Sequence, residues 1–373
     1  MNYRVWMYRV LFLSSMIIMS GCLWASASIA HLKRDLHYIY TTLRDSHPGM
    51  HNKDDPDFLT FLEDTNQQAQ EALKDILTEK EGRVVLESFV EGFQDKHLRL
   101  MWKNAQKVSS VSVPSSKFLV QDDGKMVYIR LPHFAPSSPD QVRQLTTIID
   151  DMPTYRKRTI VFDVRGNGGG NSTWGSKLLA NLFTPNYFYL MRERVLAQET
   201  VIWRCSKANV EFLQKNLPVI MQGLPEDEQG YWRSLLRGLR LAYEKGHLLY
   251  EEKKDVPAVC SSSLPHPVTA TVVVLIDSGC FSACLDFLDE LKMMDYPNLI
   301  FVGMPTGSDT IYMDVHTVDL PSGQGSLGFP MKMYRNRPRG HNEPHLPDVR
   351  RPWDREGGSL SQDIALVSSL LEK

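Results

Sequence analysis

The sequence lacks the features that mark several classes of protein. It has 5 cysteines among 373 residues, with no Cys-x-x-Cys pair and no cysteine–histidine cluster at zinc-site spacing, so we expect no metal site. The formal net charge of -2, without a basic stripe, excludes a general nucleic-acid-binding protein. A phosphate loop ending in Gly-Lys-Ser/Thr and a G-x-G-x-x-G fingerprint are both absent. We therefore expect no cofactor.

Long apolar runs are also scarce. Residues 10–19 form the longest one near the N-terminus, directly after Arg4 and Arg9. This run is too short to span a bilayer as a stable helix, but it has the length of a signal-peptide core. We predict that residues 1–21 are a signal peptide and that the protein is exported to the periplasm or cell envelope of a bacterium. No later segment resembles a transmembrane helix.

Two cleavage sites are compatible with this N-terminus. Met19-Ser20-Gly21-Cys22 resembles a bacterial lipoprotein signal, in which Cys22 becomes the lipidated first residue of the mature protein. Ala25-Ser26-Ala27 fits an ordinary A-x-A site instead. We favour lipidation of Cys22, which would attach the protein to a membrane.

The composition is that of a folded globular protein, with 42% hydrophobic and 23% charged residues. Residues 22–100 are predicted to form an N-terminal helical region, because apolar residues recur there at helical spacing. Its first helix places four such residues on one face: Leu32, Leu36, Ile39 and Leu43.

Residues 101–373 are predicted to form an α/β core with a mainly parallel sheet. Two runs, 159–164 and 271–276, are apolar without polar alternation, as in parallel strands that are buried on both faces. Each is followed by a loop and then by a helical pattern, which implies right-handed βαβ units. Residues 186–267 interrupt this order as a largely helical insertion. Its aromatic residues are expected to form a small core rather than a lid: Trp203, Tyr231, Trp232 and Tyr243.

Ser282 occupies the most informative position. It lies between the strand ending near Ile276 and a helical pattern that continues to Met294. The free amides of a helix N-terminus can stabilise the oxyanion that a hydroxyl nucleophile creates. The alternative is an ordinary helix cap, because serine is a preferred N-cap residue.

The cysteines give weaker signals. Cys280 and Cys284 flank Ser282, and we interpret them as small packing residues rather than nucleophiles. A disulfide between Cys205 and Cys260 is possible in an oxidising compartment.

A glycine-rich loop follows the other buried strand. Three successive glycines, 168–170, permit positive φ and close backbone approach at the carboxyl end of the strand. The loop can therefore point amides into a pocket.

Several motifs together resemble one family of serine peptidases, which comprises the tail-specific or C-terminal processing peptidases, the tricorn core and the interphotoreceptor retinoid-binding protein repeats. The motifs are Asp95-Lys96-His97, residues 162–170 (FDVRGNGGG), Phe281-Ser282-Ala283-Cys284, and the tail segments 302–307, 320–322 and 345–349. The resemblance covers most of the chain after about residue 30, with the insertion least accounted for. It implies a crotonase-like core of ββαβ and βαβ units.

The resemblance also implies site residues. Ser282 would be the nucleophile, and the Ala283 amide would form the oxyanion hole with the amide of Gly169 or Gly170. The processing peptidases place a lysine about 25 positions after the serine, but residues 305–308 contain none, so a Ser–Lys dyad is disfavoured.

The tricorn-like branch takes its base from the Asp-x-His turn, which corresponds to His97. Imidazole suits this role because its unperturbed pKa lies near neutrality. The alternative is that His97 is a polar turn residue held by Asp95. The branch's acid corresponds best to Glu343, with Asp309 and Asp314 as alternatives.

The chain departs from the family in two respects. Leu285 occupies the position of the usual glutamate, and no segment between His97 and Tyr128 is long enough for a PDZ module. The expected function is an exported serine endopeptidase that cleaves peptide or protein substrates through an acyl-enzyme. The alternative is a non-catalytic protein on the same scaffold that binds a peptide or an apolar ligand. The sequence gives no oligomeric state.

Overall fold

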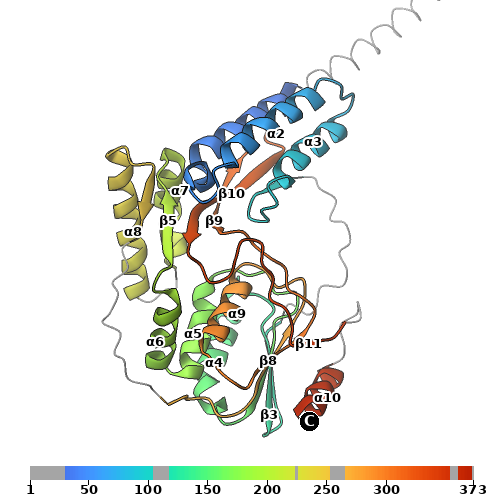
Figure 1. Cartoon of the computed structure of the whole chain (residues 1–373), viewed down its shortest axis with the longest axis vertical. Helices are drawn as coiled ribbons and strands as arrows, with labels where there is room; N and C mark the ends of the chain where they lie inside the picture. The colour runs from blue at the N-terminus through green and yellow to red at the C-terminus, as the bar shows by residue number, and fades with distance from the viewer. Residues whose placement is uncertain (1–29, 104–116, 223–225, 253–264, 353–359, 372–373) are drawn as a thin grey trace, which may run out of the picture. The chain divides into compact units, whose positions relative to one another are not determined.

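The computed structural model describes residues 30–103, 117–222, 226–252, 265–352 and 360–371. The predicted signal peptide, Cys22 and Cys260 lie outside these residues. The chain divides into two compact units, each built from three segments (Figure 1). Unit 1 consists of Met1–Gln106, Thr200–Lys253 and Tyr312–Arg335, and unit 2 of Lys107–Glu199, Lys254–Ile311 and Asn336–Lys373.

Unit 2 contains a six-stranded sheet in the order β11-β8-β7-β4-β3-β2. All neighbouring pairs are parallel except β2 with β3, which confirms the predicted mainly parallel sheet. The strands are β2 (Leu119–Asp122), β3 (Met126–Arg130), β4 (Thr159–Asp163), β7 (Val272–Ile276), β8 (Leu299–Gly303) and β11 (Val349–Arg350).

Helices cover both faces of this sheet. They are α4 (Pro139–Tyr155), α5 (Ser172–Phe183), α6 (Pro185–Leu196), α9 (Ala283–Met293) and α10 (Leu360–Leu371). Alternate residues of β7 point to opposite faces. Val272 and Val274 pack among α4, α5 and α9, whereas Val273 and Leu275 pack with Val367 of α10. The unbroken apolar character of the strand follows from this two-sided burial.

Unit 1 combines helices with a five-stranded antiparallel sheet. Its strands are β1 (Arg99–Trp102), β5 (Thr200–Arg204), β6 (Leu249–Glu251), β9 (Tyr312–Asp319) and β10 (Gly325–Arg335). Its helices are a helix over residues 30–46, the 3₁₀ turn η1 (Pro48–His51), α2 (Phe58–Ala72), α3 (Glu79–Glu91), α7 (Lys207–Ile220) and α8 (Glu226–Glu244). The four apolar residues predicted for the first helix face are buried.

The predicted insertion contains strands as well as helices. β5 and β6 pair with each other, and β5 also pairs with β10. Both strands are short, so they gave too little alternation to be recognised in the sequence. Trp203 is fully buried in a small core of unit 1, as predicted, whereas the Tyr231 side chain is 44% exposed.

No helix within the described part of the chain combines the length and the apolar character needed to cross a membrane.

Candidate active site

Two loops meet at the carboxyl edge of the unit 2 sheet, because β4 and β7 are neighbouring parallel strands. One carboxylate joins the loops: Asp277 Oδ1 accepts the Gly166 amide at 2.8 Å and the Gly279 amide at 2.9 Å. A Cβ atom on Gly279 would lie 2.6 Å from Gly166 Cα, so the backbones are in close contact. The glycine loop and the turn that leads to Ser282 therefore form one connected structure.

Ser282 has an unusual backbone conformation. It precedes α9 with φ 55° and ψ -125°, a region that residues other than glycine rarely adopt. Its side chain makes no capping hydrogen bond to the helix, which argues against the ordinary cap interpretation. A serine in a strained turn between a strand and a helix is typical of exposed hydroxyl nucleophiles.

The glycine loop lies against this serine. Gly169 has φ +96°, and a Cβ atom there would lie 2.7 Å from Ser282 Cβ and 2.9 Å from the Ala283 nitrogen. The absence of a side chain at this position therefore keeps the surroundings of the Ala283 amide open. Within the described residues, the Ala283 amide has no hydrogen-bond acceptor.

The two predicted loop amides differ. Gly169 donates its N–H to Asn167 Oδ1 at 2.9 Å. The Gly170 N–H has no acceptor among the residues that the structure describes. Gly170 and Ala283 are therefore the predicted oxyanion-hole residues whose amides remain available for a ligand.

Asn167 is a site residue that sequence reasoning missed. It is fully buried, and its Nδ2 donates to the Leu131 carbonyl at 3.0 Å. Its carbonyl accepts the Phe281 amide at 3.0 Å, one residue before Ser282. Asn167 thus connects the glycine loop to the nucleophile's turn. Its place inside the glycine motif was the available signal, but the partners of its side chain could not be read from the sequence.

The neighbouring cysteines pack as predicted. Cys280 and Cys284 are both fully buried. Burial raises the pKa of Cys284, aided by its contact with Cys280. A thiol with a raised pKa is a poor nucleophile at neutral pH. Ser282 is the better candidate.

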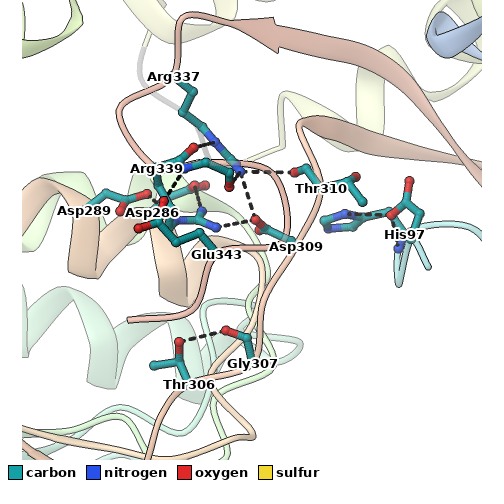
Figure 2. A network of polar contacts seen from close by, with 12 residues as sticks. His97, Asp286, Asp289, Thr306, Gly307, Asp309, Thr310, Arg337, Arg339 and Glu343 are labelled. Atoms are coloured by element: carbon teal, nitrogen blue, oxygen red, sulfur yellow. Dashed lines mark hydrogen bonds and ion pairs between the residues drawn. The ribbon is translucent and has the colours of Figure 1, made fainter. Parts of the chain in front are cut away.

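A polar network joins α9 to the segment that follows β10 within unit 2 (Figure 2). Arg339 is at its centre, with Nε 2.9 Å from Asp289 Oδ2 and Nη1 paired with Asp309. Arg337 Nη2 lies 3.2 Å from Asp309 Oδ1, and His345 Nε2 lies 2.9 Å from Asp289 Oδ1. Asp309, one of the alternative acids, is therefore held by two guanidinium groups.

The acids of α9 differ in their ionisation. Burial raises the pKa of Asp286, aided by the charge of Asp309 and opposed by the Ser172 hydroxyl, which donates to it at 2.6 Å. Burial also acts to raise the pKa of Asp289. The contacts with His345 and Arg339 together outweigh burial, so the pKa of Asp289 is lowered. The ionised Asp289 can therefore anchor the Arg339 segment on α9.

Glu343, the predicted orienting acid, lies in the same segment. Its Oε2 accepts the Gly340 amide at 2.7 Å. Together with Asp289, Lys292, Arg339 and other residues, it lines a cavity of about 270 Å³. The carboxylate thus stabilises the local turn in unit 2.

Glu290 also lies on α9, buried between α5 and α6. The Ser176 hydroxyl is 2.8 Å from both of its oxygens, and Arg192 Nε is 3.1 Å from Oε1. Burial raises the pKa of Glu290 to about 7.

This raised pKa predicts a pH-dependent stability. The folded protein binds the Glu290 proton more tightly than the unfolded chain does. Protonated Glu290 therefore contributes unfolding free energy that is fully present below the unfolded pKa and is lost as the pH rises through about 7. Between about pH 5 and about pH 8, we expect wild type to lose on the order of 2 kcal/mol more unfolding free energy than Glu290→Gln. Urea titrations at the two pH values measure this difference. Equal losses in the two proteins would contradict the prediction.

His97 lies in unit 1, in the turn before β1. It is 6% exposed, and its backbone amide donates to Asp95 Oδ1 at 2.8 Å. Its ring Nδ1 lies 3.7 Å from the same oxygen. Asp95 is thus the carboxylate beside this ring within unit 1. Ser282 belongs to unit 2, so the approach of these two residues stays a prediction.

Other candidates in unit 1 are engaged elsewhere. Asp314, the second alternative acid, lies 3.0 Å from Lys332 Nζ. Burial acts to lower the pKa of Lys332, but Asp314 and the other acidic groups around it together outweigh burial and raise this pKa well above its usual value. A lysine that stays protonated at neutral pH is not a general base.

Comparison with known proteins now identifies the class. Residues 125–350 match the model of peptidase family S41, which is more than half of the chain. The chain therefore belongs to peptidase family S41, a family of serine-type peptidases, and the predicted family is confirmed. At this level, its substrates are peptides or proteins. No curated protein sequence matches the chain significantly.

Solved structures of low sequence identity share the fold. The structure of mature CPAF complexed with lactacystin is 12% identical, with a TM-score of 0.59, over 92% of this chain and 98% of that chain. Mature CPAF alone is 11% identical, with a TM-score of 0.56, over 92% and 97% of the two chains. A lipoprotein from Streptococcus agalactiae is 13% identical over 91% and 96%, but its TM-score of 0.47 supports no conclusion.

Proposed function

We propose that this chain is an exported serine endopeptidase with Ser282 as its nucleophile. The observation that carries the proposal is the strained backbone of Ser282 at the start of α9, with Gly169 in contact beside it. Strain of this kind costs about 1–3 kcal/mol and persists where the surrounding structure enforces it, often at functional sites. Asp277 and Asn167 supply that enforcement here, because they tie the glycine loop to the turn.

In the proposed reaction, Ser282 Oγ attacks the peptide carbonyl carbon while His97 accepts the hydroxyl proton. The Gly170 and Ala283 amides donate hydrogen bonds to the oxyanion of the tetrahedral intermediate. His97 then protonates the leaving amine, which leaves an acyl-enzyme on Ser282. Water, deprotonated by His97, attacks the ester and releases the acid product and the free serine.

The orientation of the imidazole supports its role as the base. Nδ1 lies on the side of Asp95, so Nε2 is the ring atom for proton exchange with the hydroxyl. A carboxylate at Nδ1 stabilises the imidazolium that forms. We propose Asp95 for this task beside the sequence-based candidate Glu343, whose carboxylate binds the Gly340 amide. Comparing Asp95→Asn with Glu343→Gln distinguishes the two acids.

We also propose that the protein acts in the cell envelope. The basic residues Arg4 and Arg9, the apolar run 10–19 and the position of Cys22 support export and lipid attachment. Mass spectrometry of the mature N-terminus tests this, because a diacylated Cys22 has a distinct mass.

A fluorophosphonate probe tests the catalytic proposal directly. We expect it to label Ser282 covalently, and we expect His97→Ala to slow labelling by about 100-fold or more because the hydroxyl loses its base. Peptide mapping by mass spectrometry locates the label, and circular dichroism verifies that the variant is folded. A wild-type chain that binds peptides tightly but shows no labelling at Ser282 would support the non-catalytic alternative instead.

A further inference from the structure

Arg165, at the start of the glycine loop, is held by two carboxylates. From Asp163 at the end of β4, Oδ1 lies 2.8 Å from Nε and Oδ2 lies 2.8 Å from Nη2. From Asp363 on α10, Oδ1 lies 3.3 Å from Nη1 and Oδ2 lies 2.5 Å from Nη2. Asp363 and Arg165 are only 3% and 8% exposed. The C-terminal helix therefore makes a buried ion pair with the loop next to Ser282.

The surrounding charges are balanced. Arg130 Nη1 lies 2.6 Å from Asp163 Oδ1, and the Tyr128 hydroxyl donates to Asp163 Oδ2 at 2.5 Å. Two arginines thus face two aspartates. Burial raises the pKa of Asp363, although its hydrogen bond with Arg165 opposes this. Removing Asp363 would leave two buried guanidinium groups facing a single carboxylate, which is unfavourable.

Asp363 is the only charged residue in the sequence of α10 (LSQDIALVSSLL), and its side chain is buried. Apolar packing attaches the rest of the helix to the sheet, through the fully buried Val367 and its neighbours. Burying a carboxylate opposes folding unless its partner compensates. Helix attachment alone does not require this acid, because an apolar residue would serve that purpose.

A short chain of contacts runs from Arg165 to the proposed oxyanion site. The Asn167 amide donates to the Val164 carbonyl at 3.0 Å, on the other side of Arg165. Asn167 in turn accepts the amides of Gly169 and Phe281. Rotation of the Arg165 backbone would therefore displace the glycine loop relative to Ser282.

We infer that Asp363 is a positioning residue: through Arg165, the C-terminal helix α10 fixes the glycine loop in the geometry that holds the oxyanion. This inference rests on the proposed peptidase function. It assigns to the last helix of the chain a role in the reaction in addition to its packing on the sheet. A shift of about 1 Å in such a loop can lower a rate by about 100-fold.

The test uses Asp363→Asn in the full chain, which keeps the shape of the side chain and removes its charge. We expect kcat for peptide cleavage to fall about 10- to 100-fold with KM almost unchanged, because oxyanion contacts act in the transition state. Independently of activity, amide hydrogen exchange in residues 164–171 should become about tenfold faster or more, since loop opening becomes easier.

Val367→Ala is the matched control on the same helix. It removes buried methyl groups of α10 and should lower the unfolding free energy by about 1–3 kcal/mol. Well below the melting temperature, its kcat and its loop exchange should equal those of wild type. If Asp363→Asn does not fold, Asp363→Glu is tested in its place. The glutamate keeps the negative charge but moves the carboxylate by one methylene, and we expect a severalfold loss of kcat.

Two results would overturn the inference. One is a folded Asp363 variant whose kcat and whose rate of amide hydrogen exchange in residues 164–171 both equal those of wild type. The other is an equal loss of kcat and of loop protection in Val367→Ala, which would make α10 a packing element only. Failure of the proposed function gives a different result, because wild type would then either cleave no peptide or cleave it no faster than Ser282→Ala does. The exchange measurement remains decisive even for a chain without measurable cleavage.

Discussion

Replacing Ser282 with alanine should lower kcat for peptide cleavage by at least about 10⁴-fold, because no acyl-enzyme forms without the hydroxyl. The fold should survive. The substituted alanine would occupy the same backbone conformation, φ 55° and ψ -125°, and the serine side chain makes no capping bond that the helix would lose. We therefore expect a melting temperature within a few degrees of wild type, measured by calorimetry beside the cleavage assay.

Ser282→Gly is the informative companion variant. It removes the same hydroxyl, but glycine adopts a positive φ without strain. Relief of about 1–3 kcal/mol of strain, less the extra flexibility of glycine in the unfolded chain, should make it about 1 kcal/mol more stable than Ser282→Ala. Both variants should be inactive. An active Ser282→Ala protein would refute the nucleophile assignment, whereas equal stabilities would show that the backbone at this position is not strained.

Gly169→Ala should disrupt the contact between the glycine loop and the turn of Ser282. Its Cβ would lie 2.7 Å from both the Phe281 carbonyl oxygen and Ser282 Cβ, and the residue would keep φ +96° only with strain. The Phe281 contact is to backbone, so it cannot be relieved by rotating a side chain. We expect the unfolding free energy to fall by about 3 kcal/mol or more, and any folded fraction to be inactive because the loop has moved.

The adjacent Gly168 provides the control for this substitution. A Cβ atom there would have no neighbour within 4 Å, and its φ lies outside the left-handed region. Gly168→Ala should therefore resemble wild type in chemical denaturation and in cleavage rate. Equal effects of the two substitutions would contradict the contact between Gly169 and the nucleophile's turn.

The sequence predicted the fold well where burial left a simple pattern. β7 was recognisable because both of its faces are covered. The family resemblance implied that the glycine loop lies beside Ser282, and the structure brings the two together because β4 and β7 are parallel neighbours. The short strands β5 and β6 were missed, because three to five residues do not establish a period.

The motifs of the site were predictable from the sequence, but the backbone strain and the long-range ion pairs that hold its residues in place were not. The positive φ of Ser282 has no signature in the sequence, because serine rarely adopts it. Asp363 and Arg165 lie 198 positions apart, and Arg339 and Asp309 lie 30 apart, so tertiary folding alone brings each pair together. Neither pair belongs to a short motif that spacing could reveal.

The discontinuous composition of unit 1 has a consequence for biosynthesis. Trp102 of β1 pairs with Gly325 of β10, which also pairs with β5 and β9. The helices of residues 30–91 share their apolar core with Leu327 and Phe329 of that late strand. They cannot bury this surface until most of the polypeptide has been made, and contacts so distant along the chain slow folding. A nascent chain that stops before residue 325 would therefore expose an apolar helical surface and need protection by chaperones.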